Sequence, residues 1–103
     1  MKLVFAIVNG DDSQAVSKAL MKAGFFSTKL ASTGSFLSAG NTTFLICVDD
    51  HRVDDVIDVI REKSHRRKQF VPTGVGVGMD FPVEVEVGGA TIFVTDVERF
   101  DKV

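Results

Sequence analysis

The hydrophobic positions of the chain fall into short runs that match β-strands and longer periodic stretches that match helices. Residues 3–8 are apolar or small on both alternating sets, which is typical of a strand that is buried on both faces. By contrast, residues 82–87 alternate valine with glutamate, as expected for a half-exposed strand. Strands are therefore predicted at residues 3–8, 25–31, 42–48, 82–87 and 90–97.

Two segments repeat their apolar residues with the period of an α-helix. The first runs to about Ala23 and ends at Gly24, and the second carries Val53, Val56, Ile57 and Ile60 at i, i+3, i+4 and i+7. Each segment follows residues suited to capping a helix, namely Asp11, Asp12 or Ser13 for the first and Asp49 or Asp50 for the second.

The resulting order is β-α-β-β-α-β with an extra strand before the last one. This order predicts an α+β, ferredoxin-like split βαβ fold in one domain over residues 1–103, with both helices on one face of an antiparallel sheet. Residues 3–8, 43–48 and 90–97 are apolar on both faces, so one apolar face would stay uncovered in a monomer. We therefore expect copies of the same chain to cover it in a closed ring or a dimer.

Charge and composition narrow the classes of protein that fit. The formal net charge of −2 argues against a dedicated nucleic-acid binder, which usually has a basic excess. A single cysteine cannot form an intramolecular disulfide, so an oxidising compartment is not required. The N-terminal residues lack a full signal sequence, and no run reaches the ~20 apolar residues of a membrane-spanning helix. A cytoplasmic location is predicted.

The sequence does not favour catalysis. The two histidines, His51 and His65, flank the second predicted helix at opposite ends, and no Cys/His cluster has metal-ligand spacing. Cys47 lies inside an apolar strand and is predicted to be a buried structural thiol. The basic run at 65–68 is predicted to be the solvated end of the second helix, with phosphate or nucleic-acid binding as the alternative.

Two glycine-containing segments are candidates for loops. The run at 74–78 does not fit a phosphate loop, because no Lys-Ser/Thr and no helix start follow it, so residues 72–82 are predicted to be a mobile loop. Residues 28–43 combine many Ser, Thr and Gly with an apolar pair, Phe36 and Leu37. This mixture suits a nucleotide, although a β-hairpin with a polar tip has a similar composition.

Three blocks in sequence order, TKLASTGSFLSAGNTT, VDDHRVDDVIDVI and PVEVEVGGATIFV, resemble the PII-like cyclic-di-AMP receptors of the PstA/DarA family, in the PII superfamily. The resemblance covers essentially the whole chain. It implies a homotrimer of ferredoxin-like subunits, with nucleotide sites in the clefts between them and no catalysis. That implication agrees with the uncovered sheet face.

The resemblance also implies which residues contact the ligand. Thr28 and Asn41 would bond phosphate, ribose or base edges, and the backbone at Cys47 would read an adenine edge. The full implied set is Phe26, Thr28, Ser35, Phe36, Leu37, Asn41, Cys47, Gly88, Gly89 and Ala90.

Four positions depart from the usual pattern of the family. Arginine is usual where this chain has Phe26 and Ser38, so two cations expected beside the phosphates are missing. Glycine is usual at Ser35 and Cys47, and the cysteine side chain stands where adenine would approach bare backbone. Phe26 can instead stack on a base.

The sequence thus predicts a cytoplasmic, non-enzymatic signalling protein that binds a nucleotide second messenger, with cyclic-di-AMP as the first candidate. The alternatives are a PII-like trimer for another nucleotide or small anion such as ATP, or a ligand-free module for protein interaction. No cofactor, metal or membrane is expected, and the downstream protein partner is not identified by the sequence.

Overall fold

The computed structural model describes residues 1–32, 40–72 and 82–103. Its helices and strands, in chain order, are β1 (Lys2–Asn9), α1 (Ser13–Lys22), β2 (Ser27–Ser32), β3 (Asn41–Val48), α2 (Val53–Lys63), β4 (Arg66–Pro72), β5 (Pro82–Gly88) and β6 (Ala90–Asp96). A turn of 3₁₀ helix precedes each α-helix, at Gly10–Asp12 and at Asp50–Arg52.

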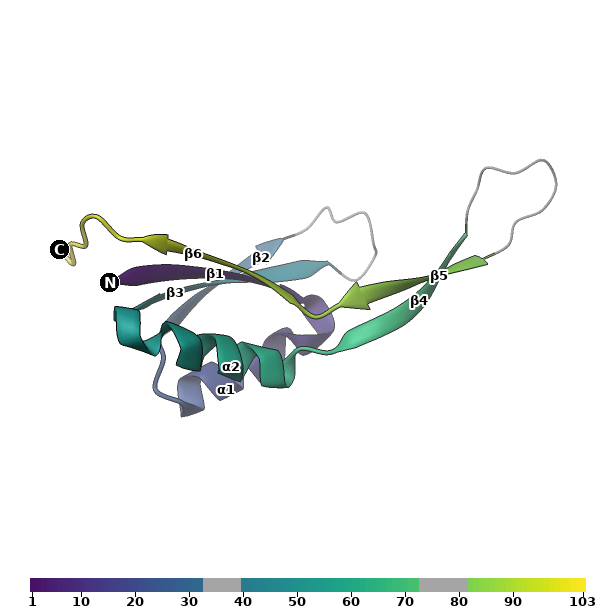
Figure 1. Cartoon of the computed structure of the whole chain (residues 1–103), viewed down its shortest axis with the longest axis horizontal. Helices are drawn as coiled ribbons and strands as arrows, with labels where there is room; N and C mark the ends of the chain where they lie inside the picture. The colour runs from purple at the N-terminus through teal and green to yellow at the C-terminus, as the bar shows by residue number, and fades with distance from the viewer. Residues whose placement is uncertain (33–39, 73–81) are drawn as a thin grey trace.

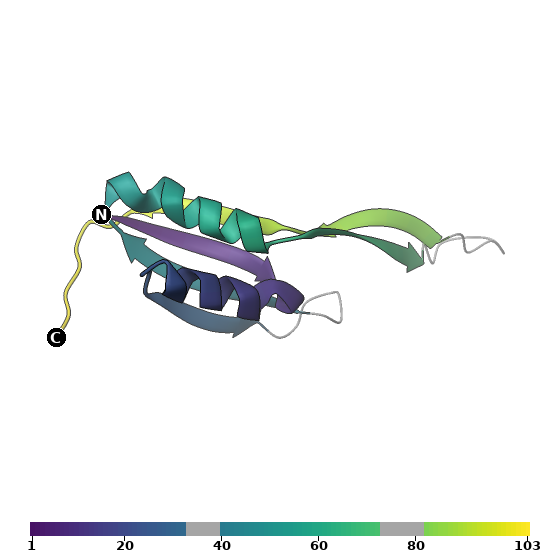
Figure 2. The same ribbon diagram turned by 90° about the horizontal axis from the view of Figure 1, so that it is seen from below.

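Four of the strands form one antiparallel sheet in the order β2-β3-β1-β6. Both α-helices lie side by side on the same face of this sheet (Figures 1 and 2). The predicted α+β arrangement, a ferredoxin-like sheet covered by two helices, is confirmed in the part of the chain that the structure describes. The two remaining strands, β4 and β5, pair only with each other and extend beyond the end of the sheet (Figure 1).

The β4–β5 pair corrects one prediction and introduces a bend between two sheets. The basic run at 65–68 does not end the second helix, because α2 stops at Lys63 and β4 begins at Arg66. Ser64 already has extended backbone, with φ −104° and ψ 126°. Strands β5 and β6 do not form a hairpin across Gly88 and Gly89, since β5 pairs with β4 and β6 pairs with β1. Gly89, at φ 75°, instead bends the chain between two different sheets.

The helix ends follow the sequence in part. Gly24 has φ 86°, its amide donates to the Met21 carbonyl, and the Phe25 amide donates to the Leu20 carbonyl. This is a Schellman end, as the position of the glycine predicts. The predicted acidic caps are correct in position only, since Asp12 is the N-cap residue of α1 and Asp49 is that of the 3₁₀ turn before α2. Neither Asp12 nor Asp49 forms a side-chain cap bond, and the first 3₁₀ turn is capped by Asn9, whose side chain accepts from the Asp11 amide.

The core lies between the helices and one face of the sheet. Alternate residues of β1 and β3 point into it, together with the apolar stripes of both helices. The buried apolar residues are Val4, Ala6, Val8, Val16, Leu20, Phe25, Phe44, Ile46, Val48, Val56 and Ile60. All eight of the largest fully buried side chains come from positions inside the predicted strands and helices, which explains why the periodic segments fold as the sequence predicts.

The opposite face of the sheet is apolar, and no helix of the described residues lies over it (Figure 2). The register places Phe5 between Leu45 and Phe93 on this face, and Leu3 opposite Cys47. Phe93 is 58% exposed and Leu30, on the same face of β2, is 48% exposed. We call this the open face, and its existence confirms that the strands are apolar on both sides.

The short turn at Gly10–Asp12 joins two distant parts of the chain. The Gly10 amide donates to the Gly40 carbonyl just before β3, at 3.1 Å. The buried Asp12 carboxylate accepts from the His65 amide just before β4, also at 3.1 Å. One turn therefore holds the starts of both β3 and β4.

Candidate functional site

The predicted ligand residues within the described part of the chain lie at the two ends of the four-stranded sheet. Phe26 and Thr28 lie at the start of β2, beside Cys47 near the end of β3. Asn41 begins β3 at the other end, on the same rung of the sheet as Asn9 and Ser32. Gly88, Gly89 and Ala90 lie at the junction of β5 and β6, and Ala90 is the β1 partner next to that rung.

At the first end the structure has a hollow of about 230 Å³, which we call the Phe26 hollow. Its lining joins the end of α1, the start of β2, the end of β3 and the turn before α2. The lining residues are Met1, Gly24, Phe25, Phe26, Cys47, Val48, Asp49 and Arg52. Phe26 is 95% exposed here, so its ring is free to stack on a flat ligand, as its residue type suggests.

Arg52 is a cation in this hollow that sequence reasoning missed. Its guanidinium carbon lies 4.3 Å from the centre of the Phe25 ring, in the geometry of a cation–π contact. The side chain is therefore held in place in the same lining as Phe26. Only the three-dimensional proximity of residues 26 and 52 reveals it.

Cys47 is exposed, so the prediction of a buried structural thiol is wrong in the single chain. The cause is its register: Cys47 lies opposite Leu3 on the open face, whereas its neighbours Ile46 and Val48 point toward the helices. Since the strand is apolar on both faces, its sequence does not show which face the helices cover.

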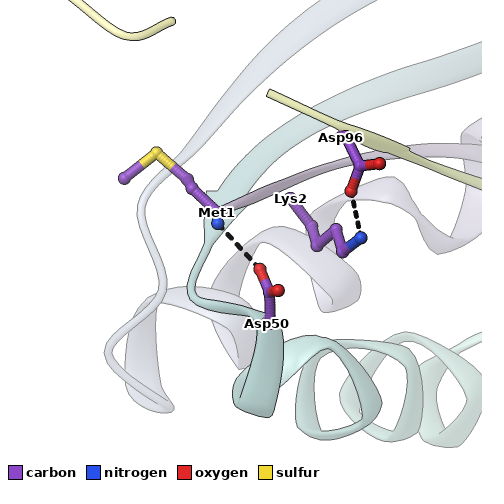
Figure 3. Close-up of polar contacts among 4 residues, drawn as sticks. All are labelled: Met1, Lys2, Asp50 and Asp96. Atoms are coloured by element: carbon purple, nitrogen blue, oxygen red, sulfur yellow. Dashed lines mark hydrogen bonds and ion pairs between the residues drawn. The ribbon is translucent and has the colours of Figure 1, made fainter. Parts of the chain in front are cut away.

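Two ion pairs surround this end of the sheet (Figure 3). The N-terminal ammonium of Met1 donates to Asp50 at 2.7 Å, and Lys2 pairs with Asp96 across the β1–β6 ladder. The bond from the ammonium lowers the pKa of Asp50, and the same bond raises the pKa of the ammonium. The bond to Asp96 likewise raises the pKa of Lys2. Asp50 thus forms an ion pair with the N-terminal ammonium and does not cap α2.

At the second end there is a larger cavity, of about 490 Å³, which we call the α2–β6 cavity. It is lined by the end of α2, the start of β4 and the start of β6. The lining residues are Ile57, Arg61, Ser64, Arg66, Gly89, Ala90, Thr91 and Ile92. Two of the predicted residues, Gly89 and Ala90, line it, and two arginines that sequence reasoning did not assign to the site lie beside them.

The two ends are far apart within one chain. Asn41 and Cys47 are six residues apart on one strand, which is about 20 Å at the usual rise of a β-strand. Arg52 and Arg61 are nine residues apart along α2 and its preceding turn, which is roughly 14 Å for helical geometry. One small group cannot hydrogen-bond to both ends, because such bonds span only ~3 Å.

Three predicted residues, Ser35, Phe36 and Leu37, lie outside the described residues, as do Ser38 and the glycine run at 74–78. Within the described residues, no group of three or more His, Cys, Asp or Glu side chains is placed to hold a metal ion. Over the same residues, no helix has the length and apolar character needed to cross a bilayer.

The whole chain matches a known family. A sequence model described as "Cyclic-di-AMP receptor" matches residues 1–103. The fold is also similar to a crystal structure of a functionally unknown protein from Pediococcus pentosaceus ATCC 25745. The two are 38% identical with a TM-score of 0.74, and the match covers 99% of this chain and 96% of that one. The resemblance to PII-like receptors is thereby confirmed, and this chain belongs to the cyclic-di-AMP receptor family.

Proposed function

We propose that this protein is a cytoplasmic signalling receptor that binds cyclic-di-AMP in clefts between the subunits of a homotrimer. The observation that carries the choice of ligand is the family membership over residues 1–103. The role is recognition, not catalysis, and the 103 residues act as one domain. Binding would be reported to a downstream protein whose identity is open.

The separation of the predicted residues supports a site made by more than one subunit. Phe26 and Cys47 lie at one end of the sheet and Gly89 at the other, beyond the reach of one small group. In a closed ring, one end of a subunit can approach the opposite end of the next. The open face, with Phe93 58% exposed, supplies the apolar surface that such an assembly would bury.

Arginines elsewhere in the chain can supply the positive charge that the resemblance leads us to expect at Phe26 and Ser38. Arg52 lines the Phe26 hollow, whereas Arg61 and Arg66 line the α2–β6 cavity. Each end of the subunit therefore offers positive charge to an anionic ligand, and charge-assisted hydrogen bonds are the strong ones. This arrangement favours a ligand with phosphate groups over an uncharged one.

The test is calorimetry of the purified protein with cyclic-di-AMP, beside cyclic-di-GMP, ATP and AMP. We expect heat from cyclic-di-AMP in preference to the others, with one ligand per subunit interface. No heat from cyclic-di-AMP at high micromolar concentration contradicts the proposal. Heat from ATP alone would support the second candidate, a receptor of the same family fold for another nucleotide.

Two substitutions localise the ligand. Asn41→Ala should weaken binding by ~1–3 kcal/mol, since a polar group of the ligand would lose its partner. The matched control is Gln14→Ala, which removes an exposed amide on α1 and should leave the affinity unchanged. Cys47→Gly should tighten binding if adenine approaches the backbone of β3, and an unchanged affinity would rule out that approach.

A further inference from the structure

The α2–β6 cavity combines features that the proposed contacts of Gly89 and Ala90 do not use. Its volume of about 490 Å³ exceeds that of the Phe26 hollow. Its walls come from three elements, which are α2, the start of β4 and the start of β6. The chemistry of its lining decides what such a space can hold.

One wall is a single stripe of α2. Ile57 and Arg61 are four residues apart, so they lie one above the other along the same side of α2, and Ser64 follows at the C-cap of the helix. The Arg61 guanidinium donates to Asp58 at 2.9 Å through Nη1. Because a guanidinium carries five N–H donors, this pair leaves most of them available to the cavity.

Ser64 adds an unpaired donor to this wall. Its Oγ atom is buried and forms no hydrogen bond, and it is the one such side-chain atom among the described residues. A buried polar group without a partner costs roughly 1–3 kcal/mol. A ligand oxygen that accepts from Ser64 would remove this cost.

The opposite wall is formed by Arg66 and Gly89. A Cβ atom on Gly89 would lie 3.4 Å from Cγ and 3.8 Å from Nε of Arg66, so the arginine side chain passes over the bare glycine. The backbone is fixed at the same point, because the Gly89 amide donates to the His65 carbonyl at 3.0 Å. Within the described part of the chain, Arg66 forms no ion pair.

The charge balance of the cavity is positive. Its described lining contains two guanidinium groups and no carboxylate. The carbonyl end of α2 opposes an anion, but a helix end carries only about half an elementary charge. Asp58 also offsets the charge of Arg61 from outside the lining, and the charge of Arg66, which has no ion pair among the described residues, still outweighs the helix end. The paired donors of a guanidinium also match the oxygens of a phosphate.

We propose that the α2–β6 cavity binds a phosphate group through Arg61, Arg66 and the Ser64 hydroxyl. The phosphate has two possible sources, a phosphodiester of the cyclic dinucleotide or a separate phosphate ion. Only the first source rests on the proposed function. The shared chemistry is an anionic tetrahedral group that accepts from two guanidiniums and a hydroxyl.

The first experiment titrates inorganic phosphate into the full chain at constant ionic strength, followed by phosphorus NMR. Replacing either arginine, in Arg61→Ala or Arg66→Ala, should weaken binding about tenfold to a hundredfold, since each removes a charge-assisted bond. Arg99→Ala is the matched control. It removes an exposed arginine that pairs with Asp101 in the C-terminal segment, and it should leave phosphate binding unchanged.

The second experiment uses Ser64→Ala. Because the hydroxyl is buried and unpaired, its removal should not lower the urea midpoint of the ligand-free protein, yet it should weaken phosphate binding severalfold. A residue with only a structural role would change the midpoint and leave the affinity alone. That outcome would contradict a ligand role for Ser64.

A competition experiment separates the two sources. If cyclic-di-AMP displaces phosphate and itself binds at least tenfold more weakly to Arg66→Ala, its own phosphodiester occupies the cavity. If both bind together, the cavity is a separate phosphate site. Should cyclic-di-AMP fail to bind at all, the proposed function fails while the phosphate titration still stands. Equal phosphate binding by wild type and the double arginine variant, or none in the millimolar range, overturns the proposal.

Discussion

The two faces of the four-stranded sheet differ in what covers them and much less in their composition. Toward the helices, β3 presents Phe44 and Ile46, both fully buried. On the open face β3 presents Leu45 and Cys47, and β6, on the far side of β1, adds Phe93, which is 58% exposed. Two faces of similar hydrophobicity thus differ in solvent exposure within one chain. The first stabilises the fold, and the second is available for association.

The largest effect is expected on the covered face. Phe44→Ala should lower the free energy of unfolding by ~3–5 kcal/mol, because it leaves a cavity in a fully packed core. Urea denaturation followed by circular dichroism measures it. The control is Phe100→Ala, which truncates an aromatic ring that is 60% exposed and should cost no more than ~0.5 kcal/mol. Similar losses in the two variants would contradict the assignment of the core.

The open face should respond through association. Phe93→Glu should weaken the contact between copies by roughly 1.5–3 kcal/mol per side chain, the value of burying one phenylalanine. Sedimentation velocity should then show a shift from trimer to monomer. Met21→Glu is the control, since Met21 is 73% exposed on α1 and should leave the assembly intact. A stable wild-type monomer would refute the proposed use of this face.

A smaller effect is expected where α1 ends, since this end directs the chain into β2 under the covered face. Gly24→Ala should destabilise the fold by about 1–2 kcal/mol, because a Cβ atom is strained at φ 86°. Gly24→Asn should cost less, as asparagine tolerates this conformation better. Thermal denaturation of both variants measures the difference. Equal stability of wild type and Gly24→Ala would show that the glycine is not required.

The smallest effect concerns the ion pair between the Met1 ammonium and Asp50. The pKa of Asp50 is lowered, so its contribution is lost as the pH falls below about 4, and the ammonium's pKa is raised, so the contribution is lost again well above pH 8. Asp50→Asn should therefore shift the urea midpoint slightly at pH 6, and this shift should shrink as the pH falls below about 4 or rises well above 8. Both partners are exposed, which keeps the effect small.

The Asp101→Asn variant is the control for this pH window. Asp101 pairs with Arg99, whose guanidinium keeps its charge at pH 10. Its contribution, if measurable, should therefore persist at high pH. An Asp50→Asn effect that also persists at high pH would contradict the assignment of the ammonium as the partner.

The periodic segments of the chain were predictable because their sequences contain the cause of their structure. The stripe of Val56 and Ile60 and the apolar run of β1 each specify a buried surface. Strand β4 was not predictable in this way. Its basic start at Arg66 has no apolar alternation, and its pairing with β5 is formed across residues 73–81. Cys47 shows a second limit, since a strand that is apolar on both faces does not reveal which face the helices cover.

The sequence predicted which residues belong to the candidate site, but not how these residues are arranged in space. The residues taken from the family resemblance could be named from the sequence, yet their division between two ends of the sheet follows from the register. The arginines were missed for the same reason. Arg52 belongs with Phe26, and Arg66 with Gly89, only because the fold brings together residues more than twenty positions apart.

The turn at Gly10–Asp12 has a consequence for local opening of the fold. Its Gly10 amide donates a hydrogen bond to the Gly40 carbonyl, just before β3. Its Asp12 carboxylate accepts one from the His65 amide, just before β4. When this turn opens, the amide protons of Gly10 and His65 lose protection together, although they are far apart in sequence. Hydrogen exchange should thus give these two amides a common opening free energy. Residues 40 and 65 then belong to one cooperative unit, so a change that destabilises the start of β3 also promotes local opening at the start of β4.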